Sequence, residues 1–181
     1  MSADWKRFIP VLAFVGRFLG IYIAGNLLYG WMVESYAPDA DPITRSVTHQ
    51  VAGVMSALGY DVMPYETESM AQVNLFWNNH TVLSLFEGCN GINVMIVWLA
   101  FLVAIGPVNR RMWTVAGAGL IVIHMLNLIR IILLFMVAEY SARQFYFVHK
   151  YLFTAFLYVA VFAGWWLWLR MRPAAKIPSE L

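Results

Sequence analysis

Four long apolar stretches limit most strongly what this chain can fold into. They cover residues 8–32, 90–105, 114–138 and 151–169. A helix that crosses the hydrocarbon core of a bilayer needs about 20 mostly apolar residues. The composition excludes an ordinary soluble domain, because 61% of the 181 residues are hydrophobic and only 12% are charged. We therefore predict an all-α membrane protein with four transmembrane helices, of which the second is the shortest.

The distribution of charge predicts how these spans are oriented. Basic residues flank the spans on one side, at Lys6, Arg7, Arg110, Arg111, Arg170, Arg172 and Lys176. By the positive-inside rule these segments lie in the cytoplasm, so both termini face the cytoplasm and the segment 34–88 faces outward. The apolar part of the first span is longer than a signal-peptide core, and no convincing small-residue cleavage site follows it. We expect a retained anchor.

The outward segment contains two predicted elements. "TRSVTHQVAGVMSALGY" predicts an amphipathic helix that lies on the outer membrane surface or covers the bundle, with one apolar face formed by Val47, Val51, Val54, Met55 and Leu58. "QVNLFWNNHTVLSLFEG" has two short apolar runs around Asn78, Asn79 and His80, which is typical of a small β-hairpin. Residues 1–181 are thus expected to form a single membrane domain with an outward cap at 34–88.

Cys89 is the single cysteine of the chain, which excludes an intramolecular disulfide, a CxxC redox pair and a thiolate metal cluster. It lies in "EGCNGI", directly before an apolar span. Asn90 can cap the following helix, and a helix N-terminus lowers the pKa of a cysteine. Gly88 and Gly91 would allow a tight turn and the close approach of a substrate chain. Alternatively, Cys89 is a small, half-buried apolar residue.

Arg130 interrupts the third span, in "LIVIHMLNLIRIILLFMV". An arginine at such a depth costs about 2.5 to 3.5 kcal/mol on insertion scales, so we expect it to face the bundle interior and to have an anionic or dipolar partner. His124, Asn127 and Arg130 are spaced i, i+3 and i+6, which gives a polar stripe along the helix. His124 is expected to be a packed, hydrogen-bonded residue.

His149 lies in "FYFVHKYLF", where an outward loop enters the fourth span. The predicted topology brings Cys89, Arg130 and His149 from three helices to the same outer leaflet. In a small bundle with short connections these groups can converge in one pocket. Glu87, Glu139 and Asn93 are candidates for the mouth of that pocket, although solvated positions at the interface explain them equally well.

These motifs resemble the exosortase and archaeosortase family of membrane transpeptidases. The resemblance is carried by "EGCNGI", "NLIRI" and "HKYLF", in that order and with this topology, and covers about the last hundred residues. Many members have more spans and a serine after the cysteine, where this chain has Asn90. The chain looks like a compact subgroup such as the exosortase H type.

The resemblance implies a cysteine protease or transpeptidase that cleaves the C-terminal sorting signal of exported proteins at the periplasmic face of the bacterial inner membrane. Cys89 would be the nucleophile that forms a thioester, with Arg130 and His149 completing the site. Supporting or substrate-binding roles are expected for Asn90, Gly91, Asn127 and Glu87. The partners would be exported proteins whose signal contains a motif, a transmembrane segment and a basic tail, and an amine acceptor or water would resolve the thioester.

The sequence predicts neither a metal nor a cofactor, because it contains no ligand spacing and no nucleotide or flavin motif. Nucleic acid is not an expected partner, because the chain lacks a basic patch with interleaved aromatic residues. Two other functions remain open. One is a non-enzymatic membrane assembly factor or small transporter subunit, in which Arg130 pairs with Glu87 or Glu139 for structural reasons. The other is a redox partner that forms mixed disulfides through Cys89, although no resolving cysteine accompanies it.

Overall fold

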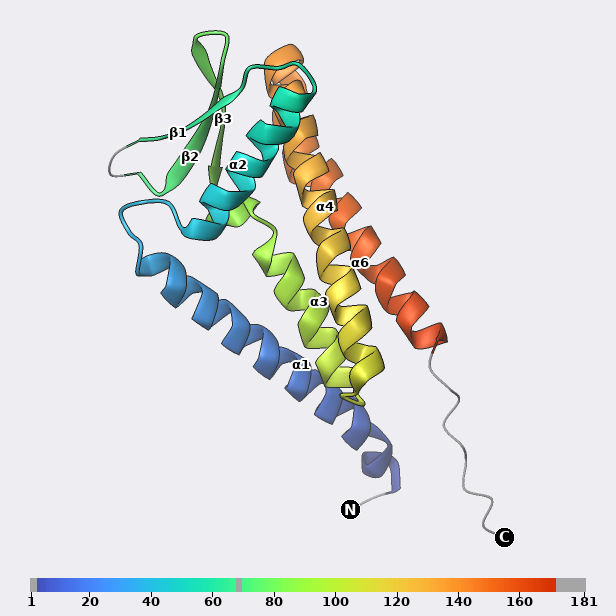
Figure 1. Cartoon of the computed structure of the whole chain (residues 1–181). Coiled ribbons are helices and arrows are strands. Elements are labelled where there is room, and N and C mark those ends of the chain that lie inside the picture. Colours follow the sequence, from blue (N-terminus) through green and yellow to red (C-terminus); the bar gives the residue numbers. More distant parts are fainter. Residues whose placement is uncertain (1–2, 68–69, 172–181) are drawn as a thin grey trace.

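The computed structural model describes residues 3–67 and 70–171, and the protein is mostly helical (Figure 1). Helices α1 (Ala3–Glu34), α3 (Ile92–Ile105), α4 (Arg110–Tyr140) and α6 (Phe153–Arg170) form an elongated bundle. At one end of this bundle, α2 (Pro42–Ala57) and a small sheet form a cap. The start of α1 and the end of α6 both lie at the opposite end. Arg172 and Lys176, which contribute to the predicted orientation, lie outside the described residues.

Three helical segments of the described chain are long and apolar enough to cross a membrane, namely Phe8–Glu34, Arg110–Tyr140 and Ala142–Arg170. The second predicted span corresponds to α3, which has only 14 residues and is shorter than the other three. At helical rise α3 measures about 21 Å, against a hydrocarbon core of about 30 Å. The structure therefore supports a membrane protein with three candidate spanning helices and a fourth, shorter apolar helix.

The bundle core is organised by Trp98 of α3, which is 4% exposed. Its indole lies against Gly119 of α4 and Gly164 of α6, and a Cβ at either glycine would come within 3 Å of the ring. The indole N–H donates a hydrogen bond of 3.2 Å to the carbonyl oxygen of Ala116. Two glycines thus let three helices pack on one aromatic ring, while the polar atom of that ring remains satisfied. On the other side of α3 lies α1.

Asp41 caps the N-terminus of helix α2. Its carboxylate accepts hydrogen bonds from the backbone N–H groups of Ile43 and Thr44, and Pro42 is the first residue of the helix. The residues that α2 buries are Thr44, Val47, Thr48, Val51, Ala52 and Met55. They pack on α4 and on the sheet. The sequence analysis also assigned Val54 and Leu58 to this face, but they are exposed. Val54 lies at the edge of the buried face, and Leu58 follows the last residue of α2.

The sheet has three antiparallel strands in the order β1 (Met63–Glu66), β2 (Gln72–Trp77) and β3 (His80–Phe86). The predicted hairpin corresponds to β2 and β3, and its two-residue turn uses Asn78 and Asn79 in the positive-φ conformation that such turns require. The sequence analysis missed β1. Its four residues include Pro64 and are too few to show a clear alternation. The strand lies at an edge of the sheet, which is where proline is tolerated.

Candidate active site

A cavity of about 130 Å³ brings together Cys89, Arg130 and His149. Its walls come from β3, from the part of α4 near the cap and from the segment that precedes α6. The remaining lining residues are Leu83, Ser84, Leu85, Phe86, Ile131, Leu134 and Phe145. The three groups that the sequence analysis selected from separate helices therefore line one small enclosed space, which can hold a single side chain and the peptide bond beside it.

Cys89 ends the short 3-10 helix η1 (Glu87–Cys89), which follows β3 without a break. The residue is buried, with 8% of its surface exposed. Burial raises the pKa of the Cys89 thiol above its ordinary value, while a hydrogen bond from the Phe86 backbone and the charge of Arg130 lower the pKa, and Glu87 raises it. The sequence analysis expected a lowered pKa from the helix N-terminus. That expectation was wrong, because removal of the sulfur from water is the largest effect.

Asn127 links Cys89 to Arg130. Its side chain is fully buried, its amide N–H donates to the Cys89 carbonyl oxygen at 3.0 Å, and its oxygen accepts from the Arg130 guanidinium at 3.3 Å. Gly91 lies against this amide and has a φ of +84°, and a Cβ there would lie 3.1 Å from the Asn127 Cγ. Both its backbone conformation and the packing therefore require a glycine at position 91.

Arg130 is 9% exposed, and its Nε is buried. In the part of the chain that the structure describes, this Nε has no hydrogen-bond partner. The sequence analysis considered a structural pairing of Arg130 with Glu87 or Glu139. Among the described residues Arg130 pairs with neither, and Glu139 instead lies 2.9 Å from the His80 imidazole at the hairpin turn. The guanidinium of Arg130 therefore keeps no carboxylate partner among the described residues and lines the cavity.

His149 belongs to a π-helical turn, Val148–Leu152, which joins α5 (Phe145–Phe147) to α6. The 3-10 helix η2 (Ala142–Gln144) connects α5 to α4. The imidazole stacks on the ring of Phe145 with a centroid distance of 5.6 Å and an interplanar angle of 3°. Within the described residues, neither ring nitrogen of His149 forms a hydrogen bond. The stacking fixes the plane of the ring and leaves both nitrogens free to exchange a proton.

Asn90 and Glu87 do not line this cavity. Asn90 is buried, and its amide donates to the hydroxyls of Tyr29 and Thr44 while its oxygen accepts from the backbone N–H of Ile92. These bonds attach the start of α3 to α1 and α2. Glu87 is exposed, and its carbonyl oxygen accepts from the Tyr29 hydroxyl. Asn90 is therefore placed to support the position of Cys89 rather than to touch a ligand in the cavity.

His124 also lies away from the cavity, because its Nε2 is 2.8 Å from the Gln50 side-chain oxygen on α2. The sequence analysis selected none of the other seven lining residues, of which Phe145 and Ser84 are examples. Phe145 precedes His149 by four residues, a helical spacing that indicates contact. Ser84 is paired with Asn74 on the neighbouring strand, and its hydroxyl donates to the Asn74 side-chain oxygen at 2.6 Å. Only the register of the hairpin could have revealed that second residue.

The arrangement combines a thiol, an imidazole with free nitrogens and a buried cation with an unpaired donor. These are the groups that acyl transfer through a covalent intermediate requires. Among the described residues, no three histidine, cysteine, aspartate or glutamate side chains are grouped in a way that could hold a metal ion.

A comparison with protein families gave a match to this chain. The family model described as transmembrane exosortase matches residues 10–169, which includes the bundle, the cap and all residues of the cavity. Searches of curated proteins and of solved structures found no match.

Proposed function

The chain belongs to the transmembrane exosortase family, and from this premise we propose that it is a membrane-embedded cysteine transpeptidase. Family membership supports a membrane transpeptidase with a role in protein sorting. The finer proposal is that the enzyme cleaves the C-terminal sorting signal of exported proteins and transfers the cargo to an acceptor. The observation that carries it is the single cavity shared by Cys89, Arg130 and His149.

The proposed topology has four spans, both termini in the cytoplasm and the active site at the periplasmic face of the bacterial inner membrane. Helix α4 has 31 residues and measures about 46 Å at helical rise. It exceeds a hydrocarbon core of about 30 Å, and its last turns pack under the cap. With Arg110 at the cytoplasmic boundary, Arg130 lies about 30 Å further along the helix. This length supports a position for Arg130 at the outer boundary of the membrane. The sequence analysis had expected a position deep in the span.

In the proposed acylation step, His149 accepts the proton of the Cys89 thiol as the sulfur attacks a peptide carbonyl carbon. The raised pKa of the thiol makes such a base necessary at neutral pH. A carbon–sulfur bond forms, and the carbonyl oxygen becomes an oxyanion. When the carbon–nitrogen bond breaks, the departing amine takes the proton from His149. The products are a thioester between cargo and Cys89 and a released C-terminal segment.

Arg130 is the proposed stabiliser of the oxyanion. Donors in this role are typically worth about 2.7 to 4 kcal/mol in the transition state, and the small, largely apolar cavity strengthens the interaction. Asn127 and Gly91 would hold the guanidinium and the Cys89 backbone in fixed positions relative to each other. Asn90 would fix the start of α3. Glu87 raises the pKa of the thiol and does not touch the cavity, so its proposed place is outside the reacting groups.

The thioester would be resolved by an amine of the acceptor or by water. The proposed partners are exported proteins whose signal carries a short motif, an apolar segment and a basic tail. The proposal requires no metal or other cofactor, because thiol, imidazole and guanidinium supply nucleophile, base and electrostatic stabilisation.

The experiment compares the C-termini of exported proteins in host cells that carry the wild-type chain, Cys89→Ala or Cys89→Ser. We expect a set of shortened C-termini that only the wild-type chain produces, with unchanged abundance of all three enzymes in the membrane. A covalent cargo adduct on the wild-type chain should be released by hydroxylamine, as a thioester is. Identical C-termini in all three strains would refute the transpeptidase. An adduct released only by reductant would indicate a mixed disulfide instead.

A further inference from the structure

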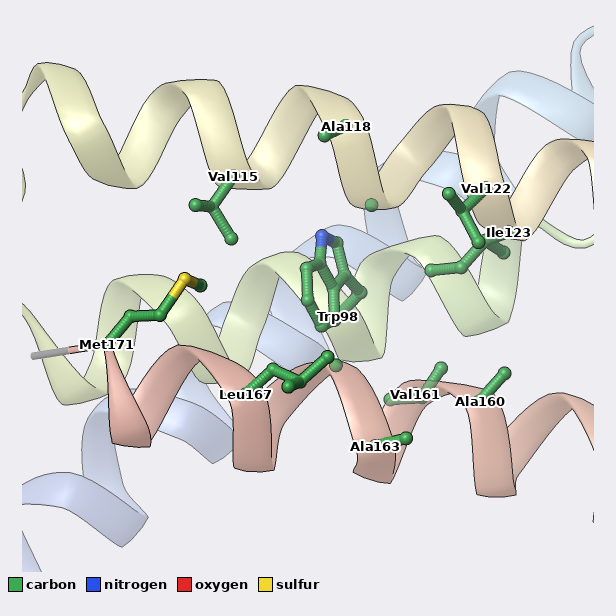
Figure 2. A pocket seen from close by; sticks show the side chains of 12 residues that line it. Trp98, Val115, Ala118, Val122, Ile123, Ala160, Val161, Ala163, Leu167 and Met171 are labelled. Carbon is green, nitrogen blue, oxygen red and sulfur yellow. The ribbon is translucent and has the colours of Figure 1, made fainter.

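The apolar crevice between α4 and α6 lies within the bundle, away from the Cys89 cavity. It has a volume of about 490 Å³. Figure 2 shows its two walls, one from each helix, with Trp98 of α3 between them. The lining residues are Trp98, Val115, Ala118, Gly119, Val122, Ile123, Ala160, Val161, Ala163, Gly164, Leu167 and Met171. Among the residues that the structure describes, no charged side chain lines it.

The floor of the crevice is fixed before any ligand arrives. Trp98 is held between Gly119 and Gly164, and its indole N–H is bonded within the bundle. Ala118 and Ala163 stand on opposite walls with exposed side chains. Helices in a membrane associate where small residues let their backbones approach closely. A preformed hollow with small residues on both walls is thus shaped for another helix.

The crevice continues toward the active site. About one to two helical turns further along the same two helices lies a second hollow, lined by Ile129, Arg130, Leu133, Leu152, Phe153 and Phe156. Arg130 lines this hollow and the Cys89 cavity as well. Its guanidinium is nine-tenths buried and includes the unpaired Nε. The two hollows share no lining residue, but both lie between α4 and α6, and the second adjoins the Cys89 cavity at Arg130. We call this line of two hollows, which leads to the Cys89 cavity, the seam.

The length of the seam matches one membrane span. From Val115 to Leu133 along α4 it measures about 27 Å, close to the hydrocarbon thickness of about 30 Å. A different hollow between α1 and α3 contains Arg17, but shares no residue with the Cys89 cavity. The seam between α4 and α6 combines about the length of a transmembrane helix with access to the Cys89 cavity.

We propose that this seam binds the apolar transmembrane helix of the protein substrate. This inference rests on the proposed function. The bound helix packs on Trp98 and the alanines of both walls, and its outer end meets Arg130. The peptide bond that precedes this end in the substrate chain is thereby brought to Cys89 at a fixed depth. The seam thus selects the peptide bond that is cleaved by its distance from the apolar segment.

Filling the seam tests the proposal. Ala118→Leu and Ala163→Leu place extra carbons in the crevice without touching buried packing. Ala155→Leu is the matched control on α6, because Ala155 is exposed and lines neither hollow, and Ala13→Leu fills the α1–α3 hollow. A displacement of about 1 Å can cost roughly 100-fold in rate, so we expect processing of the Cys89-dependent C-termini to fall about tenfold or more in the seam variants only.

Cross-linking tests contact directly. Ala163→Cys in a Cys89→Ala background leaves one cysteine in the chain. The probe is the exported protein with the most abundant Cys89-dependent C-terminus, carrying single cysteines along its apolar segment. We expect disulfides at helical spacing. Unchanged processing in both seam variants, or an absence of periodic cross-links because lipid fills the crevice, would overturn the inference. Such results leave the Cys89-dependent C-termini in place, whereas failure of the proposed function would remove them.

Discussion

Asn127→Ala should destabilise the protein and impair processing at the same time. The substitution removes the donor to the Cys89 carbonyl at 3.0 Å and the acceptor of the Arg130 guanidinium at 3.3 Å. Each of the two buried polar groups left without a partner costs about 1 to 3 kcal/mol, so the free energy of unfolding should fall by about 2 to 6 kcal/mol. A domain is typically stable by about 5 to 15 kcal/mol, so the variant should still fold.

The effect on rate has a separate origin. Without Asn127 the thiol and the guanidinium lose their shared anchor, and a misplacement of about 1 Å costs roughly 100-fold. Denaturation in detergent micelles measures the stability, and cargo processing measures the rate. Asn93→Ala is the matched control, because Asn93 is exposed at the start of α3. If Asn127→Ala and Asn93→Ala had equal stability and equal processing, the assignment of Asn127 as the anchor would be refuted.

Three further predictions follow from local geometry and charge. Gly91→Ala should abolish processing and lower the melting temperature. Gly117 has open space around it, so Gly117→Ala should raise the melting temperature slightly. Equal shifts of the melting temperature in the two variants would contradict the packing argument. Because burial raises the pKa of Cys89, alkylation by iodoacetamide should be slow at pH 7 and accelerate above the ordinary thiol pKa of about 8.5; a plateau already at pH 7 would contradict this. Hydrogen bonds to the Asn78 carbonyl and to Glu139 raise the pKa of His80. The stabilising contribution of His80 should therefore be complete below a pH of about 6.5 and be lost as the pH rises through the raised pKa. Glu139→Gln should reduce this dependence of the melting temperature on pH.

Helix positions and the hairpin could be predicted because their signals are local. An apolar run long enough to span a membrane and the "NN" pair of the turn each indicate the structure of their own segment. β1 could not be predicted, because it becomes a strand only when β2 offers it a partner. The same limit applies to Val54 and Leu58. Their apolar character was visible, but which row of α2 faces the sheet depends on the tertiary contacts.

The candidate site shows the same division. The sequence analysis selected Cys89, Arg130 and His149 by their side-chain chemistry. The predicted topology then indicated that they lie near one another. The pKa of the thiol was predicted in the wrong direction, because a helix N-terminus is visible in the sequence and the burial created by β3 and α4 is not. The role of Asn127 was equally hidden. Its position beside Arg130 on the helix was evident, but its bond to the Cys89 carbonyl joins residues far apart in the chain.

The resting site is poised for a substrate rather than for spontaneous chemistry. Burial holds Cys89 in its neutral form, and the unpaired Nε of Arg130 costs the free protein about 1 to 3 kcal/mol. The Arg130 side chain lines the cavity, and its positive charge would bind the oxyanion that forms on attack more strongly than it binds the neutral substrate carbonyl. Interactions that strengthen on the way to the transition state raise the rate, whereas equal binding throughout does not. The charge of Arg130 is therefore an interaction that can favour the transition state over the bound substrate.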